Sequence, residues 1–93
     1  MANFVIKRDG TKEPFDAEKI RKSIAAASEQ ANLSEERKNE LVEQVTATVL
    51  QMAEPREEIA TSEIREKILS ELDQIEPAVS AAWRKYDEEK GKI

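Results

Sequence analysis

The chain has 93 residues, which is enough for one domain, since a domain usually takes about 100 to 200 residues. It contains no cysteine and no histidine, so it offers no disulfide, no thiolate zinc site, no cysteine nucleophile and no imidazole base. The net charge of −5 disfavours binding to nucleic acids and to anionic membranes. These counts argue against most enzyme classes and against a zinc ribbon within these residues.

The charges are unevenly distributed along the chain. Residues 1–22 carry a net charge of +2, whereas the other 71 residues carry −7. The difference indicates either a local anion site near the N-terminus or ordinary variation of a solvated surface. The sequence has no run of 18 apolar residues and no signal-peptide segment, so we expect a cytoplasmic protein that does not contact membranes.

The segment 1–15 predicts a β-hairpin cap. Residues 4–6 form a short β-prone run, Phe-Val-Ile. The Asp-Gly pair at 9–10 is a strong turn signal, because glycine adopts a positive φ without a Cβ clash. Residues 12–15 are the expected return strand, and Pro14 keeps it short or at the sheet edge because it has no amide hydrogen to donate.

Apolar residues at helical spacing predict a bundle of about four helices over residues 16–90. The first helix is expected to begin after Asp16 as its N-cap and to end near Asn32. The second is expected to begin at Ser34, again as N-cap, and to end before Pro55.

The third helix is expected to begin at Thr61 or Ser62, with either residue as its N-cap, and the fourth at Pro77. The polar residues 88–93 are expected to fray. The residues expected on the buried faces are Ile20, Ile24, Ala27, Leu41, Val42, Val45, Val49, Met52, Ile64, Ile68, Leu69, Leu72, Ile75, Val79, Ala82, Trp83 and Tyr86. The sequence therefore predicts a single α+β domain over residues 1–93, with the hairpin packed on the helices.

The chain shows no sign of catalysis or of direct nucleic-acid binding. Its serines have no histidine to activate them, and two glycines cannot form a P-loop or a dinucleotide fingerprint. No cluster of metal-ligating residues is visible. The four aromatic residues, Phe4, Phe15, Trp83 and Tyr86, occupy positions that suit a core, so we expect packed rings rather than exposed stacking surfaces.

Three cations near the N-terminus point to an anion site. Lys7 and Arg8 end the first predicted strand, and Lys19 follows Asp16 by three residues. Because hairpin and helix are joined directly, these cations can converge beside the positive N-terminal end of the helix, where a phosphate gains charge-assisted hydrogen bonds. The alternative is that they are solvated, as exposed charges usually are.

The segments Val-Ile-Lys-Arg-Asp-Gly at 5–10 and Phe-Asp-Ala-Glu-Lys-Ile at 15–20 resemble the signature of the ATP-cone domain family. That signature is roughly V-x-K-R-[DN]-G, a short spacer, an aromatic or aliphatic residue, D or N, and x-x-K-I. Residues 60–64 and 81–86 resemble, more loosely, the start of the family's third helix and its C-terminal aromatic helix. The resemblance implies a small β-sheet cap over a four-helix bundle.

ATP-cones are allosteric nucleotide-sensing domains of ribonucleotide reductases and of the zinc-ribbon repressor of reductase genes. The resemblance therefore implies a non-catalytic domain that binds ATP or dATP, with Mg²⁺ held through the phosphates. Its expected readout is control of a homo-oligomer or of a reductase-type or regulator partner. Since a ribbon needs cysteines, the chain is expected to be either a free-standing cone or part of a longer protein.

The resemblance also assigns nine site residues. The phosphate-binding residues it implies are Lys7, Arg8, Lys19, Thr61 and Arg65, and the adenine-binding residues are Val5, Glu13, Asp16 and Ile20. Val5 and Ile20 would flank the base, whose exocyclic amine would donate to Glu13 or Asp16. The alternative is that Val5 and Ile20 are core residues and that Thr61 is only a helix cap.

The last helix departs from the family pattern. Family members often carry Tyr-Arg there, whereas Asp87 follows Tyr86 in this chain, so Arg84, Lys85 or Lys90 would have to supply a phosphate ligand. This departure leaves two other functions open. One is a helical protein-interaction module with a degenerate pocket, and the other is a transcriptional co-regulator without its own DNA-binding ribbon.

Overall fold

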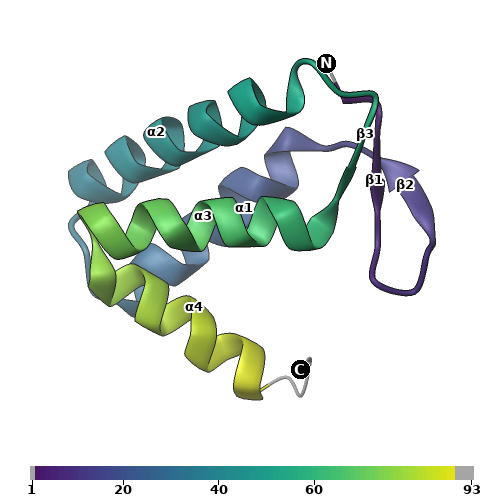
Figure 1. Cartoon of the computed structure of the whole chain (residues 1–93). Coiled ribbons are helices and arrows are strands. Elements are labelled where there is room, and N and C mark those ends of the chain that lie inside the picture. The colour runs from purple at the N-terminus through teal and green to yellow at the C-terminus, as the bar shows by residue number, and fades with distance from the viewer. Residues whose placement is uncertain (1, 90–93) are drawn as a thin grey trace.

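A computed structural model describes residues 2–89 of the chain. The elements in chain order are β1 (Phe4–Ile6), β2 (Lys12–Pro14), α1 (Ala17–Gln30), α2 (Glu35–Ala53), β3 (Glu58–Ala60), α3 (Thr61–Ile75) and α4 (Pro77–Glu89). The strands lie side by side at one end of the molecule, and the helices extend away from them (Figure 1). The predicted α+β architecture, a small sheet capping four helices, is confirmed.

The hairpin closes through the predicted glycine turn. The Lys7 N–H donates to the Thr11 carbonyl and the Gly10 N–H donates to the Lys7 carbonyl, each over 2.8 Å. Gly10 has φ +89°, which a residue with a Cβ rarely adopts. The Thr11 N–H also donates to Asp9 Oδ1 over 2.9 Å, and hydrogen bonding from Thr11 lowers the pKa of Asp9. These bonds hold the end of β1 and hence the backbone of Lys7 and Arg8.

β3 is a third strand that the sequence does not predict. The sheet order is β2-β1-β3, with β1 antiparallel to β2 and parallel to β3. Ile59 pairs with Val5 and is only 1% exposed, so burial and pairing hold this segment extended. Pro14 lies in the edge strand β2, as predicted. Since α3 follows β3 without a loop, the strand brings the start of α3 close to the hairpin.

Lys12 links the two outer strands across β1. Its Nζ lies 2.6 Å from Glu58 Oε2 and 5.1 Å from the centroid of the Phe4 ring. The hydrogen bond to Glu58 raises the pKa of Lys12. Both side chains are about half exposed, so this ion pair contributes little to the stability of the fold.

Helices α1 and α2 begin at the caps that the sequence predicts. Asp16 accepts a hydrogen bond from the Glu18 N–H over 2.9 Å, and Ser34 accepts from the Arg37 N–H over 3.1 Å. The chain leaves α1 through Asn32, whose φ is +63°. Asparagine is one of the few residues that tolerate this conformation at a helix end.

The prediction that Thr61 or Ser62 caps α3 is wrong. The helix begins at Thr61, and its N-cap is Ala60, which has no side-chain acceptor. Glu63 instead accepts from the Ala60 N–H over 3.3 Å, and an ion pair with Arg56 holds its carboxylate in place. The N–H groups of the first turn of α3 therefore have no capping side chain.

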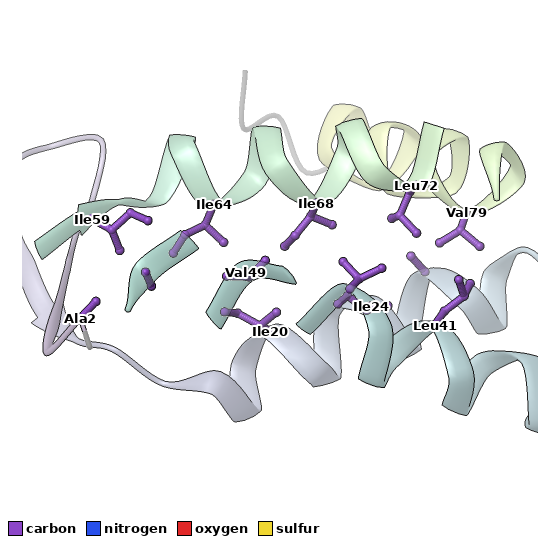
Figure 2. Close-up of a cluster of buried hydrophobic side chains, with 13 residues drawn as sticks. Ala2, Ile20, Ile24, Leu41, Val49, Ile59, Ile64, Ile68, Leu72 and Val79 are labelled. Atoms are coloured by element: carbon purple, nitrogen blue, oxygen red, sulfur yellow. The ribbon is translucent and has the colours of Figure 1, made fainter. Parts of the chain in front are cut away.

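The hydrophobic core lies between the four helices and beneath the sheet. Its most buried members, none more than 2% exposed, are Ile24, Leu41, Val45, Val49, Ala53, Ile59, Ile68, Leu72 and Val79. Figure 2 shows Ile64, Ile68 and Leu72 in a row along α3, facing side chains of α1 and α2. The predicted helix faces thus form the core, although Val42, Met52 and Ile75 lie at its margin.

The expectation that all aromatic rings are packed is wrong for Tyr86, which is 49% exposed. Phe4, Phe15 and Trp83 are half-buried. Helical spacing correctly places Trp83 and Tyr86 on the side of α4 that faces α1, but it cannot reveal how closely the two helices pack there.

Helix α4 runs to Glu89, so the first two residues of the tail predicted to fray, 88–93, belong to the helix. Residues 90–93 lie outside the described residues. In the described part of the chain, no helix combines the length and apolar character needed to span a membrane.

Two parallel hydrogen bonds join α3 to α4. Arg84 donates from Nη1 and Nη2 to the two carboxylate oxygens of Asp73, each over 3.0 Å. The hydrogen bonds from Arg84 are the main cause that lowers the pKa of Asp73 to about 2.

Replacing Leu72, which is fully buried, with alanine should lower the free energy of unfolding by about 2 to 5 kcal/mol, because the substitution leaves a cavity at the centre of the core. Urea unfolding followed by circular dichroism measures the loss. Leu50→Ala is the matched control, since Leu50 is half-buried and should cost clearly less. An equal loss in the two variants would contradict this placement of the core.

Arg84→Gln should raise the pKa of Asp73 from about 2 toward the ordinary 3.8. Because the folded-state pKa is the lower one, the pair stabilises the fold above about pH 4 and loses that contribution as the pH falls toward 2. An NMR pH titration of the Asp73 carboxyl measures the shift. Lys85→Gln, which removes the neighbouring charge, should leave that pKa near 2, and an equal rise in both variants would refute the specific pair.

Candidate functional site

A cleft of about 400 Å³ opens between the hairpin and the first halves of α1 and α3. This volume lies within the range of about 300 to 1,000 Å³ that is usual for small-molecule sites. Its lining residues are Val5, Lys7, Arg8, Glu13, Pro14, Phe15, Asp16, Lys19, Ile20, Ser23, Thr61, Ser62, Ile64, Arg65, Ile68 and Trp83. Figure 1 shows that α1 and α3 both begin at the end of the molecule where the strands lie.

All nine residues that the resemblance assigns to the site line this one cleft. They come from distant parts of the sequence, since Lys7 and Arg8 follow β1 whereas Thr61 and Arg65 belong to α3. The parallel pairing of β3 with β1 brings these segments together. The structure therefore provides one continuous surface for the residues, and their individual roles in binding remain predictions.

The sheet side of the cleft combines an apolar and an acidic side chain. Val5 and Glu13 are direct partners across β1 and β2, so their side chains lie on the same face of the sheet. Ile20 projects from the first turn of α1 and is 9% exposed, so it belongs both to the core margin and to the wall of the cleft. An apolar wall beside a carboxylate suits a flat heteroaromatic ring that carries an amine.

The cationic side of the cleft is open to solvent. Lys7 Nζ lies 3.5 Å from Glu13 Oε2, and both side chains are more than a third exposed. This ion pair is therefore weak, and water or a ligand can replace either partner at little cost. Lys19 is exposed and forms no ion pair within the described residues. Arg8 and Arg65 extend the positive surface on the hairpin and on α3. Such a surface attracts a polyanion of small size.

Two helices begin at this cleft, and their first turns differ. The N-terminus of α1 is capped by the carboxylate of Asp16, whereas α3 has no capping side chain. The first-turn residues Thr61 and Ser62 line the cleft. Uncapped N–H groups and the positive end of the helix dipole both favour an anion at this position.

Sequence reasoning missed several lining residues, and their signals differ. Ser23, Ile64 and Ile68 each lie one helical turn beyond a residue that was assigned to the site, so helical spacing could have found them. No comparable signal assigns Trp83 to the site. Among residues 2–86, whose side chains are described, it is the only lining residue from α4.

The phosphate ligand sought on the last helix is not found among the described residues. Arg84 and Lys85 do not line the cleft, and Arg84 is held by Asp73. Lys90 lies outside the described residues.

Comparison with known proteins agrees with the family resemblance seen in the sequence. A family model described as "ATP cone domain" matches residues 3–92. The chain is also similar to proteins named transcriptional repressor NrdR. It is 36% identical to that of Bdellovibrio bacteriovorus over 73 residues, or 78% of this chain and 37% of the repressor. It is 38% identical to the repressor of Lactobacillus delbrueckii subsp. bulgaricus over 72 residues, which are 77% of this chain and 45% of that repressor.

The chain therefore spans less than half the length of these repressors. The family model, by contrast, covers almost the whole chain, and it agrees with the sheet-capped four-helix fold and the cleft beneath the hairpin. On this evidence the chain belongs to the ATP-cone family of nucleotide-sensing regulatory domains.

Proposed function

We propose that this chain is a non-catalytic sensor that binds ATP or dATP in the cleft, and that its occupancy controls the oligomerisation or activity of a ribonucleotide-reductase-type partner. The observation that carries the proposal is the convergence of the nine assigned residues, drawn from the hairpin, α1 and α3, on one cleft of about 400 Å³. A sensor of this kind needs binding groups but no nucleophile or general base, which agrees with a sequence without histidine or cysteine.

In the proposed complex, the adenine ring lies against Val5 and Ile20, and its exocyclic amine donates to Glu13 or Asp16. The phosphates lie among Lys7, Arg8, Lys19, Thr61 and Arg65. The uncapped first turn of α3 supports this orientation, because its N–H groups suit a phosphate oxygen. Among the side chains that the structure describes, those of residues 2–86, no group of three metal-ligating residues gathers, so Mg²⁺ would be held through phosphate oxygens.

The regulatory step follows from linkage. A nucleotide shifts an equilibrium between two states of a protein only if it binds one of them more tightly. We propose that the nucleotide-bound chain and the free chain differ in their affinity for a partner, whether a second copy or a reductase-type protein.

A second candidate role is supported by the comparisons. Relatives that share 36% and 38% identity with this chain are named transcriptional repressors. The nucleotide signal could therefore act on transcription, with this chain as one part of a repressor or as the partner of one. Co-purification of the chain with a DNA-binding protein would favour that role over control of a reductase.

Calorimetric titration should show binding of ATP and dATP, and Lys19→Gln should weaken both by about tenfold or more, because a hydrogen bond to a charged group is lost. Lys67→Gln is the matched control. Lys67 is an exposed lysine of α3 that does not line the cleft, and its loss should leave the affinity nearly unchanged.

Absence of heat with ATP, dATP, ADP and GTP would refute the nucleotide sensor. If ultracentrifugation of the same protein showed a concentration-dependent oligomer, the interaction module with a degenerate pocket would become the better description. Equal losses in Lys19→Gln and Lys67→Gln would contradict the site while leaving nucleotide binding intact.

Glu13→Gln should lower the ratio of ATP affinity to GTP affinity. The carboxylate only accepts hydrogen bonds, which suits the amine of adenine, whereas an amide can also donate to the carbonyl oxygen of guanine. Calorimetry with both nucleotides gives the ratio, and Glu36→Gln, an exposed change on α2, is the control. An unchanged ratio in Glu13→Gln would exclude Glu13 as the base acceptor and leave Asp16.

A further inference from the structure

Trp83 takes part in two neighbouring hollows. It is the only residue of α4 that lines the cleft among residues 2–86, whose side chains are described. Together with Ser23 it also lines a second hollow of about 340 Å³, whose other lining residues are Lys22, Ala26, Ala27, Gln30, Ala82 and Tyr86. We call this second space the α1–α4 hollow. Because Ser23 follows Asp16 by about two helical turns, the two spaces meet at the end of the cleft away from the start of α1.

The helix that carries Trp83 is anchored on both sides of this residue. Before it, Val79 and Ser80 are at most 1% exposed, and the Ser80 hydroxyl donates to the Pro77 carbonyl over 2.9 Å. After it, Arg84 is joined to α3 through two hydrogen bonds of 3.0 Å. The Trp83 side chain itself is only half-buried. If a ligand in the cleft moves Trp83, we therefore expect the indole ring to change its orientation while the backbone of α4 stays in place.

We infer that Trp83 contacts the bound nucleotide and couples occupancy of the cleft to the shape of the α1–α4 hollow. This inference rests on the proposed function, since it takes a nucleotide as the occupant of the cleft. An indole ring stacks on the face of a base or sugar, and its N–H donates to an oxygen atom. Either contact fixes the ring, and the same ring forms part of the wall of the α1–α4 hollow.

The consequence is a surface that differs between the free and the bound chain. The α1–α4 hollow is lined by three alanines and two aromatic rings, so a rotation of the large Trp83 ring changes much of its shape. Tyr86 lies one turn after Trp83 on the same side of α4 and is 49% exposed. Its surroundings should change when Trp83 becomes fixed.

The composition of the chain makes both residues directly observable. Trp83 is its one tryptophan and Tyr86 its one tyrosine. Intrinsic tryptophan emission therefore reports on the cleft, and the single ¹⁹F NMR resonance of 3-fluorotyrosine at Tyr86 reports on the α1–α4 hollow. Titration with ATP should change both signals until they saturate, with the same midpoint as calorimetry on the same protein.

Variants test whether Trp83 carries the coupling. Trp83→Leu should weaken ATP binding by about tenfold, the typical effect of losing one base–aromatic contact, and should abolish the ¹⁹F shift at saturating ATP. Val42→Ala truncates a half-buried side chain of α2 that lines neither space, so it should keep both the affinity and the shift. Circular dichroism checks folding, and if Trp83→Leu does not fold, the unaltered chain alone decides.

The outcomes separate this inference from the proposed function. Calorimetric binding of ATP without any change in Trp83 emission or in the Tyr86 resonance would overturn the inference and leave the nucleotide sensor standing. A full ¹⁹F shift in a folded Trp83→Leu protein would overturn the coupling. Absence of binding heat would remove the proposed function, and the inference with it.

Discussion

The parallel pairing of β3 with β1 is the constraint on which the rest of the structure depends. Ile59 pairs with Val5 and is almost fully buried, so a three-residue strand joins two segments that are more than 50 residues apart in the sequence. Because α3 follows β3 directly, the pairing also sets the position of the first turn of α3 opposite α1. Without it, the hairpin would carry its cations beside α1 alone, and Thr61 and Arg65 would lie elsewhere.

The polar groups that line the cleft contribute little to folding. Lys7, Arg8 and Lys19 are exposed, the ion pair between Lys7 and Glu13 spans 3.5 Å, and the N-cap of α3 has no side-chain acceptor. Stability comes instead from the apolar residues between the helices. This separation allows the polar groups of the cleft to be available for a ligand while the core remains closed to water.

Local features of this protein were predictable, and features created by distant contacts were not. The turn at Gly10 and the caps Asp16 and Ser34 depend on neighbouring residues, so their residue types identify them. β3 was missed because only its pairing partner makes it a strand, and the exposure of Tyr86 depends on how α1 and α4 pack against each other. For the site, the motif at 5–20 identified the hairpin and α1 residues, but no local signal identified Trp83.

The open first turn of α3 has a consequence for the amount of folded protein. This helix carries Ile64, Ile68 and Leu72, which face α1 and α2 along the length of the core. An anion bound at its start would supply acceptors that the N-cap Ala60 lacks, and its binding free energy would add to that of folding. For so small a domain, with a correspondingly modest core, the cellular concentration of the ligand would then influence how long the protein survives as well as what it signals.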